Sequence, residues 1–142
     1  MEKRRKGLIK REDFLEAMSR VAQTVSIVTT DGPAGRAGVT VSAMCSVSAD
    51  PPMVLVCIHH QSRAVYSIQQ NRAFCVNVLA DDMEVFANKF ASIVSTTVMF
   101  EDADWETAVT ESPILVGAVT SFDCRVEEIH RAGSHLIFLG KV

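Results

Sequence analysis

The hydroxyl-bearing residues between positions 35 and 62 are the part of this chain best suited to ligand chemistry. Thr40, Ser42 and Ser46 stand close together in a run of small residues, and an apolar segment follows the Pro51-Pro52 break. A core strand does not need so many hydroxyl groups. A backbone that lies flat against a planar polar ligand does, because hydroxyls and backbone N–H groups provide hydrogen bonds without bulk. The same hydroxyls could also be the outward positions of an edge strand.

Two basic residues near predicted helix ends are candidates for binding a phosphate. A helix is predicted from Ser62, a good N-cap residue, to about Gln70. Its first turn would bring together a hydroxyl, unpaired backbone N–H groups and the Arg63 guanidinium, which together suit an anion. Lys89 is a second candidate, acting as a point charge. Either basic residue could instead be an ordinary solvated surface charge.

Asn77 and His135 are the other polar residues that stand out, because each lies in a predicted strand. A buried side-chain amide without partners costs about 1–3 kcal/mol, so Asn77 either contacts a ligand or holds a neighbouring loop. His135 could orient a ligand or be a plain strand histidine. The adjacent His59 and His60 are not expected to chelate one metal ion, since neighbours on a strand point to opposite faces. No metal site is predicted.

The elements that must position these groups are mostly strands. Spacing of apolar residues predicts an amphipathic helix over residues 11–22, and Asp81-Asp82 begins a further helix that ends near Phe90. Residues 91–112 show no clear period. Alternation and β-branched content predict strands over residues 23–30, 36–43, 53–58, 73–79, 114–119, 122–129 and 135–142. Many strands without βαβ alternation favour a mainly β fold, a small closed or split antiparallel β-barrel with a few peripheral helices.

The bulk composition narrows the partners and the compartment. A chain of 142 residues with 22% charged residues is typical of one soluble domain, here predicted over residues 11–142 behind a flexible basic tail at 1–10. The remainder is acidic, which disfavours nucleic acid as the main partner. Without an apolar signal segment or a membrane span, a cytoplasmic location is expected. The unpaired spacing of the cysteines predicts free thiols at Cys45, Cys57, Cys75 and Cys124.

An ordered succession of short motifs resembles the flavin reductase family with the FMN-binding split-barrel fold. Within that family, the chain is most similar to the small reductase component of two-component flavin-dependent monooxygenases, as in 4-hydroxyphenylacetate 3-monooxygenase. The resemblance runs from about Phe14 to the end of the chain, and the motifs that carry it are Thr29-Thr30, Gly38–Ala43, Cys45–Ser48, Pro51-Pro52, Val56–Ile58, Ser62, Phe74–Leu79, Lys89-Phe90 and Gly133–Leu136.

The resemblance implies a homodimeric NAD(P)H:flavin oxidoreductase. NADH or NADPH would reduce FMN, FAD or riboflavin by hydride transfer, and the reduced flavin would diffuse to a separate oxygenase. The hydride passes between the two nucleotides, so no protein nucleophile is required. A non-catalytic flavin-binding module is the main alternative, and a small barrel that serves protein assembly is a further one.

The resemblance also implies which residues form the site. His135, in Gly133-Ser134-His135, would lie near the nicotinamide as the catalytic residue. Members of the family run on beyond Gly140-Lys141-Val142, so the resemblance leads us to expect an open strand edge here, completed by further chain or by a partner subunit. The implied flavin contacts are Thr40, Val41, Ser42, Ala43, Ser46, Cys57, Ile58, Ser62, Arg63, Asn77, Lys89 and Phe90.

Overall fold

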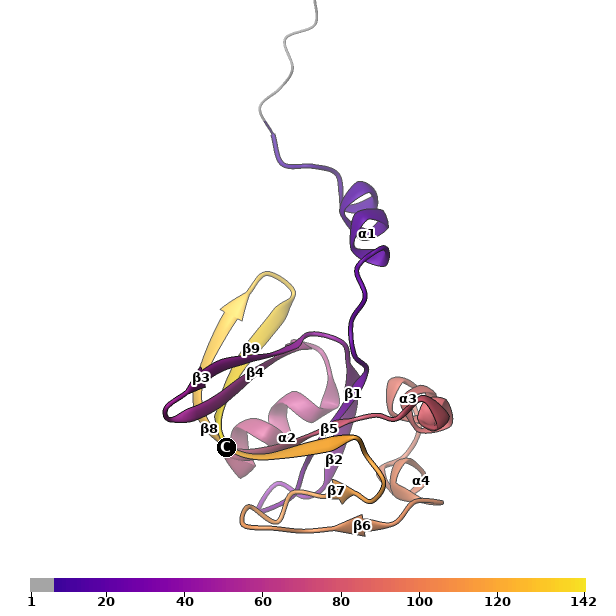
Figure 1. Ribbon diagram of the computed structural model, residues 1–142, viewed down its shortest axis with the longest axis vertical. Coiled ribbons are helices and arrows are strands. Elements are labelled where there is room, and N and C mark those ends of the chain that lie inside the picture. The colour runs from indigo at the N-terminus through magenta and orange to yellow at the C-terminus, as the bar shows by residue number, and fades with distance from the viewer. Residues whose placement is uncertain (1–6) are drawn as a thin grey trace, which may run out of the picture.

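The fold is built on one strongly curved antiparallel sheet. The computed structural model describes residues 7–142, and its main sheet has seven strands in the order β2-β1-β5-β8-β9-β4-β3 (Figure 1). Strands β2 and β3 follow each other in the chain yet stand at opposite ends of this order, so the sheet bends back on itself. Its two ends approach each other, because β2 at one end contacts β4 near the other. The prediction of a mainly β split barrel is confirmed.

The strand bounds show which segments of the alternating sequence pattern pair with a neighbouring strand. Two short strands, β6 and β7, form a separate two-stranded sheet beside the barrel. The strands are β1 Ser26–Thr30, β2 Ala37–Val41, β3 Met44–Ala49, β4 Pro52–His59, β5 Ala73–Val78, β6 Trp105–Glu106, β7 Ile114–Leu115, β8 Thr120–Ala132 and β9 His135–Lys141.

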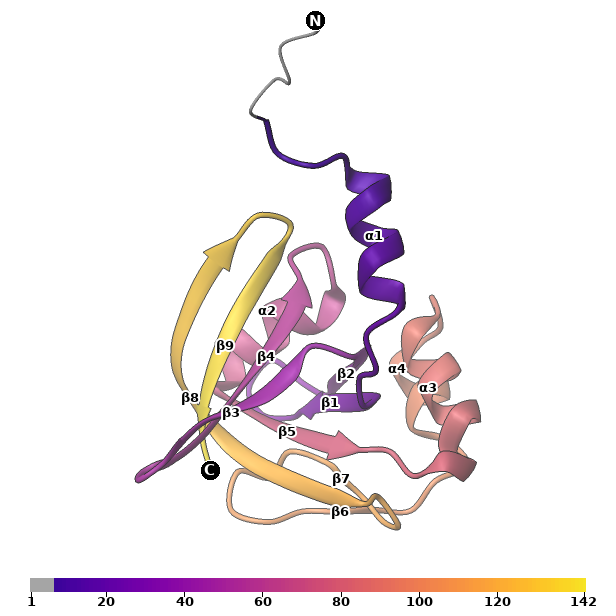
Figure 2. The ribbon, with the colours of Figure 1, turned by 45° about the horizontal axis from the view of Figure 1, so that its top comes forward.

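The helices differ in how they contact the sheet. Helix α2 packs one face against the sheet and contributes Ala64, Val65 and Ile68 to the main core, whereas Tyr66 on its other face is exposed (Figure 2). Helices α3 and α4 lie side by side next to β2, whereas α1 stands away from the barrel (Figures 1 and 2). No helix within residues 7–142 has both the length and the apolarity to cross a bilayer. The helices are α1 Arg11–Ser19, α2 Arg63–Asn71, the 3-10 turn η1 Asp81–Met83, α3 Glu84–Ala91 and α4 Thr96–Phe100.

Two apolar clusters hold the barrel and its helical end. The larger one fills the barrel, where the Phe74 and Phe138 rings meet edge-on with centroids 6.5 Å apart. The smaller one joins Ile27, Phe90 and Met99, and aromatic rings from α4 and β6 pack against it. This second cluster fixes α3 and α4 against β1 and β2, and so determines the shape of the surface between them.

The N-terminal helix forms as predicted but covers nothing in its own chain. Helix α1 is shorter than the predicted 11–22, and none of its residues is buried. Phe14 is 51% exposed and Leu15 45% exposed, so the apolar stripe faces solvent in the single chain. Of the predicted basic tail at 1–10, residues 1–6 lie outside the described part, and residues 7–10 are exposed without regular structure.

The end of the chain is not an open strand edge, contrary to the expectation from the family resemblance. Strand β9 pairs with β8 on one side and with β4 on the other, from His135 to Lys141. The edges of the main sheet are instead β2 and β3. The prediction failed because position in the sequence does not fix position in a sheet whose strand order is rearranged.

The four cysteines are free, as predicted, but only two of them are fully buried. Burial, with a smaller contribution from the charge of Asp123, raises the pKa of Cys75 to about 12, and the same two causes raise the pKa of Cys124 to about 12. Cys57 is half-buried, and burial raises the pKa of its thiol, whereas Cys45 is exposed.

These environments predict selective thiol reactivity. Because the thiolate is the reacting form, a thiol of pKa 12 has roughly one thiolate in 10,000 molecules at pH 8. We expect native protein treated with a disulfide reagent at pH 8 to show a single fast-reacting thiol, Cys45. Cys45→Ser should abolish the fast phase, and Cys75 and Cys124 should react only after unfolding. A fast phase that persists in Cys45→Ser would contradict this assignment.

Candidate functional site

Several of the predicted site residues meet in one groove beside β2. The groove has a volume of about 490 Å³, which is within the range of sites that hold nucleotide-sized ligands. It runs between β2, the turn that leads into α2, and the segment after α3. The lining residues are Gly38, Val39, Thr40, His59, Gln61, Ser62, Arg63, Phe90, Ala91, Ser92, Ile93 and Met99.

The apolar wall of the groove is formed by Phe90 lying directly on the β2 backbone. A Cβ added to Gly38 would stand 2.4 Å from Phe90 Cε1, so only glycine allows this contact. The Phe90 ring is 2% exposed, and the rings of Phe100 and Trp105 lie 5.1 and 5.8 Å from it. A ring held in this way makes this wall of the groove rigid.

Thr40 lines the groove, but its hydroxyl proton is already used. Its Oγ1 donates to the Ala87 carbonyl at 2.6 Å, which ties β2 to α3. A ligand therefore meets an accepting oxygen and a methyl group at Thr40. The donor role expected for this hydroxyl is corrected to that of an acceptor.

Ser62 and Arg63 form the cationic end of the groove. Ser62 caps α2 as predicted, with its side chain accepting from the Ala64 backbone N–H at 3.3 Å. The hydroxyl proton of Ser62 is not needed for the cap. One nitrogen of Arg63 donates to the Val94 carbonyl at 2.5 Å, which leaves the remaining N–H groups of the exposed guanidinium for an anion.

A smaller polar cavity continues past Arg63. It measures about 240 Å³ and shares Gly38, Arg63 and Met99 with the groove. Arg36 also lines it, and the Arg36 Nε lies 3.1 Å from a carboxylate oxygen of Asp31. The two guanidinium groups give this end of the groove a positive charge.

Asn77 does not face the groove. Its side chain is fully buried, and its Nδ2 donates to the Ile27 carbonyl at 3.1 Å. Its Oδ1 accepts from the Leu115 backbone N–H and from the Ser121 hydroxyl, both at 2.9 Å. Of the two roles considered for Asn77, the structure supports the one in which this amide holds a neighbouring loop. The expected contact between its side chain and a flavin does not fit this geometry.

Lys89 is also directed away from the groove. Its ammonium donates to the Glu101 carbonyl at 3.2 Å and lies 3.6 Å from a carboxylate oxygen of Asp102. Both partners belong to the connection between α4 and β6, so Lys89 fastens that connection to α3. The prediction that Lys89 binds a phosphate does not fit this geometry.

The remaining predicted residues fall into two groups. Val41 and Ile58 are buried in the main core, so their side chains support the groove from behind. The others lie beyond the groove and do not line it; they are Ser42, Ala43 and Ser46, on the path from β2 into β3, and Cys57 on the neighbouring β4.

His135 does not line the groove itself but contacts His59, which does. It pairs across β4 and β9 with His59, and the two rings meet edge-on with centroids 5.2 Å apart. The His135 Nδ1 lies 2.8 Å from the Ser134 hydroxyl. The predicted catalytic histidine is thus close to the groove but held by the β8–β9 turn.

The sequence-based prediction missed the part of the groove that α4 completes. Met99 lines the groove from α4, and Ile93 lines it from the connection between α3 and α4. Helix α4 has five residues, too few for a visible helical period, and its only local signal is Ser95, which caps Val98 N–H. His59 and Gln61 also line the groove; the resemblance places the flavin along residues 56–63, but neither was named as a contact.

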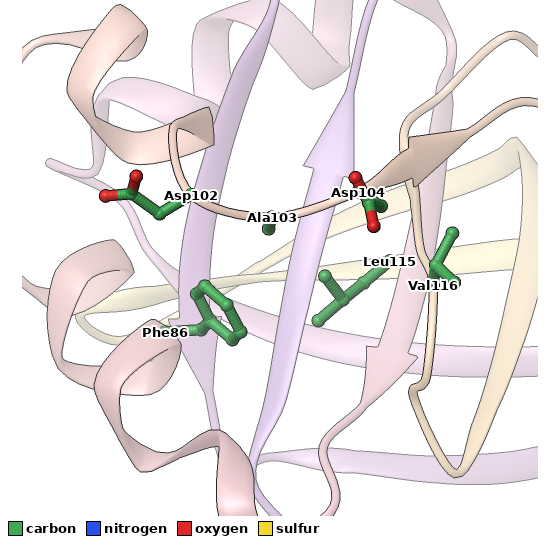
Figure 3. A pocket seen from close by; sticks show the side chains of 6 residues that line it. All are labelled: Phe86, Asp102, Ala103, Asp104, Leu115 and Val116. Carbon is green, nitrogen blue, oxygen red and sulfur yellow. The ribbon is translucent and has the colours of Figure 1, made fainter.

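A second cavity, of about 380 Å³, has the opposite charge. Figure 3 shows Asp102 and Asp104 on either side of Ala103, and the apolar Phe86 and Leu115 line the cavity as well. Carboxylates repel a phosphate, so this cavity suits the predicted ligands less well than the groove does. Within residues 7–142, no group of three or more His, Cys, Asp or Glu side chains is placed to hold a metal ion.

Comparison with known proteins decides the family. The sequence profile of the flavin reductase like domain matches residues 18–142. The chain belongs to this family. It is 48% identical over 131 residues to the FMN reductase (NADH) RutF of Serratia proteamaculans, a match that covers 92% of this chain and 74% of the relative.

Solved structures of flavin reductases have the same fold. A protein of Haemophilus somnus assigned as a flavin reductase superposes with a TM-score of 0.90 at 41% identity, over 94% of this chain and 85% of that chain. BorF, the flavin reductase component of a bacterial two-component tryptophan halogenase, superposes with a TM-score of 0.85 at 29% identity, over 93% of this chain and 84% of that chain. The resemblance inferred from the motifs is confirmed.

Proposed function

We propose that this chain is an oxidoreductase that transfers a hydride from NADH to FMN and releases the reduced flavin to a separate oxygenase component. The observation that carries the proposal is the groove joining β2, Ser62-Arg63 and Phe90 in a chain 48% identical to an FMN reductase (NADH). The balanced reaction is NADH + FMN + H⁺ → NAD⁺ + FMNH₂, in which NADH supplies a hydride and solvent supplies the proton.

The residues of the groove fit a flavin mononucleotide. Phe90 and the Gly38 backbone offer an apolar wall for the ring system, and Thr40 accepts a hydrogen bond at its rim. Ser62 and Arg63 stand at the helix start where a terminal phosphate would be neutralised. The protein's task is to hold the two nucleotides with their reacting atoms about 3–3.5 Å apart, so that no side chain enters the bond changes.

The site residues outside the groove have supporting roles in this proposal. The exposed Ser42 and Ser46 would contact the part of the ligand that extends beyond the groove along β3. His135, beside the groove, would orient the nicotinamide. Asn77 and Lys89 have structural roles and are not included among the ligand contacts.

The exposed helix α1 supports a homodimer as the working form. Its Phe14 and Leu15 side chains contact no other part of the chain's core, and Leu8 and Ile9 just before it are exposed as well. A second copy would remove this apolar stripe from water. Sedimentation that gives a monomer at micromolar concentration would contradict the dimer without affecting the proposed reaction.

Steady-state oxidation of NADH with and without added FMN tests the proposed reaction. We expect oxidation to depend on FMN, and parallel assays with NADPH, FAD and riboflavin define the preference for each partner. FMN binding without NADH oxidation would contradict the proposal and favour a non-catalytic flavin-binding module. The absence of FMN binding would contradict both functions.

The role of Arg63 predicts a difference between two flavins. Arg63→Ala should raise the Kd of FMN by about 10-fold or more, because a charge-assisted hydrogen bond is lost, and should change the Kd of riboflavin by less than about 2-fold. Fluorescence titration with each flavin measures both values. Arg125→Ala, which removes an exposed guanidinium from β8, serves as the control and should alter neither. Equal weakening of FMN and riboflavin by Arg63→Ala would contradict a phosphate contact.

A further inference from the structure

His59 reaches the groove from the end of β4, and the motif pattern did not include it. Strand β4 ends at His59, where the chain turns toward the start of α2. The His59 side chain lines the groove together with Gln61, Ser62 and Arg63. Among the residues of 7–142 that line the groove, His59 is the one histidine, because His60 and His135 lie outside its lining.

The position of the His59 proton follows from a backbone contact. The Gln61 backbone N–H donates to His59 Nδ1 at 3.2 Å. Because Nδ1 accepts this hydrogen bond, the neutral imidazole carries its proton on Nε2. The charged imidazole also has a proton on Nε2. His59 therefore presents a donor at Nε2 in both of its protonation states.

Neighbouring rings hold His59 in this orientation. The His60 ring stacks on it with centroids 4.9 Å apart, and the His135 ring meets it edge-on at 5.2 Å. His60 is itself fixed, because its Nδ1 lies 2.7 Å from the Ser134 carbonyl and must donate to that oxygen. The strand ends at His59, so His60 does not point to the opposite face as the strand pattern had predicted.

We propose that His59 is a ligand-binding residue that donates a hydrogen bond from Nε2–H to an oxygen of the nucleotide held in the groove. The acceptor is a phosphate, ribityl or carbonyl oxygen of FMN, or a carboxamide or phosphate oxygen of NADH. The identity of the ligand rests on the proposed function. The donor itself follows from the Gln61 contact, the ring stack and the place of His59 in the groove.

Two substitutions separate the two nitrogens of the ring. His59→Asn keeps an amide oxygen near the Nδ1 position, where it can accept from the Gln61 N–H, but lacks a donor that reaches the Nε2 position. His59→Gln places an amide N–H near the Nε2 position. If Nε2–H is the donor, His59→Asn should weaken nucleotide binding more than His59→Gln does, although the Asn variant better preserves the hydrogen bond from the Gln61 N–H.

Equilibrium binding of each nucleotide alone to the full chain tests the donor. We expect His59→Asn to raise the Kd of FMN or of NADH by about 3- to 10-fold, and His59→Gln to stay within about 2-fold of the unsubstituted chain. Weakened FMN binding identifies the flavin as the acceptor, and weakened NADH binding identifies the nicotinamide nucleotide. His130→Asn and His130→Gln, at an exposed histidine paired with Glu128, are matched controls and should alter neither Kd.

Three results would overturn the proposal. They are unchanged affinities in His59→Asn, equal losses in His59→Asn and His59→Gln, or a greater loss in the Gln variant. Equal losses would mean that ring packing against His135 is what matters, and thermal unfolding of both variants checks that the fold is retained. Because binding is measured without turnover, a chain that binds FMN but fails to oxidise NADH would contradict the proposed function while leaving this comparison intact.

Discussion

Replacing Asn77 with alanine should lower the free energy of unfolding by about 3 kcal/mol or more, and should leave the affinity for FMN nearly unchanged. The amide is fully buried and links β1, β5, β8 and the segment that forms β7. Its loss strands the buried Leu115 N–H and removes the acceptor of the Ser121 hydroxyl, and it also leaves a small cavity. Each stranded group costs the desolvation free energy of a polar atom without a partner.

Urea unfolding at constant temperature measures this loss, and fluorescence titration with FMN under folding conditions measures affinity. Asn88→Ala is the control, because Asn88 is exposed on α3 and should change the free energy of unfolding by less than about 0.5 kcal/mol. A Kd for FMN that rises 10-fold in a still-folded Asn77→Ala protein would mean that the amide contacts the ligand after all.

Replacing Gly38 with alanine should damage the groove directly. The new Cβ would lie 2.4 Å from Phe90 Cε1 and 2.7 Å from Cδ1, so the ring must move. The ring cannot move freely, because Phe100 and Trp105 pack against it. We expect a loss of about 1–3 kcal/mol in the free energy of unfolding from this overpacking, together with a rise of about 10-fold or more in the Kd of FMN.

Gly140→Ala provides a matched control for the loss of stability. A Cβ there would stand 2.5 Å from Phe74 Cζ and 2.8 Å from Cys124 Cβ, in the main core away from the groove. This variant should unfold more easily yet bind FMN within about 2-fold of the unsubstituted chain when folded. If Gly38→Ala binds FMN as tightly as Gly140→Ala does, Phe90 is not a wall of the flavin site.

Local sequence signals correctly predicted those elements whose geometry is determined by residues close together in the chain. Ser62 caps α2 with its own side chain, so the start of that helix could be identified. The β-branched run before Asp31 pairs as β1, within the predicted strand 23–30. These elements depend on residues close together in the chain.

The remaining differences depend on distant contacts. The predicted strand 36–43 stops at Val41 and a new strand begins at Met44, because the chain must cross there from one end of the sheet to the other. The predicted strand 114–119 pairs only at Ile114 and Leu115, and the Leu115 N–H is held by Asn77. The first break has no Pro or Gly to signal it, whereas Gly117, with a φ of +90°, stands just after the second.

The prediction of the candidate site was right for residues that the paths of the strands and helices bring to the groove. It was wrong where the direction of a side chain decides whether a residue reaches the groove. Thr40, Ser62, Arg63 and Phe90 come together because β2, α2 and α3 meet at the groove. Lys89, next to Phe90 in the chain, turns to Glu101 instead. Its direction depends on α4 and the loop after it, which the sequence pattern did not reveal.

Anaerobic mixing of NADH with FMN and the purified chain is the most direct test of the central claim, that the groove beside β2 is where NADH reduces FMN. The loss of the visible absorbance of oxidised FMN follows the reaction in a single turnover. We predict rapid loss with the unsubstituted chain and with Gly140→Ala, and a reaction at least about 10-fold slower with Gly38→Ala at the same subsaturating FMN concentration. Reduction no faster than that of NADH and FMN without protein, or equal rates for Gly38→Ala and Gly140→Ala, would contradict it.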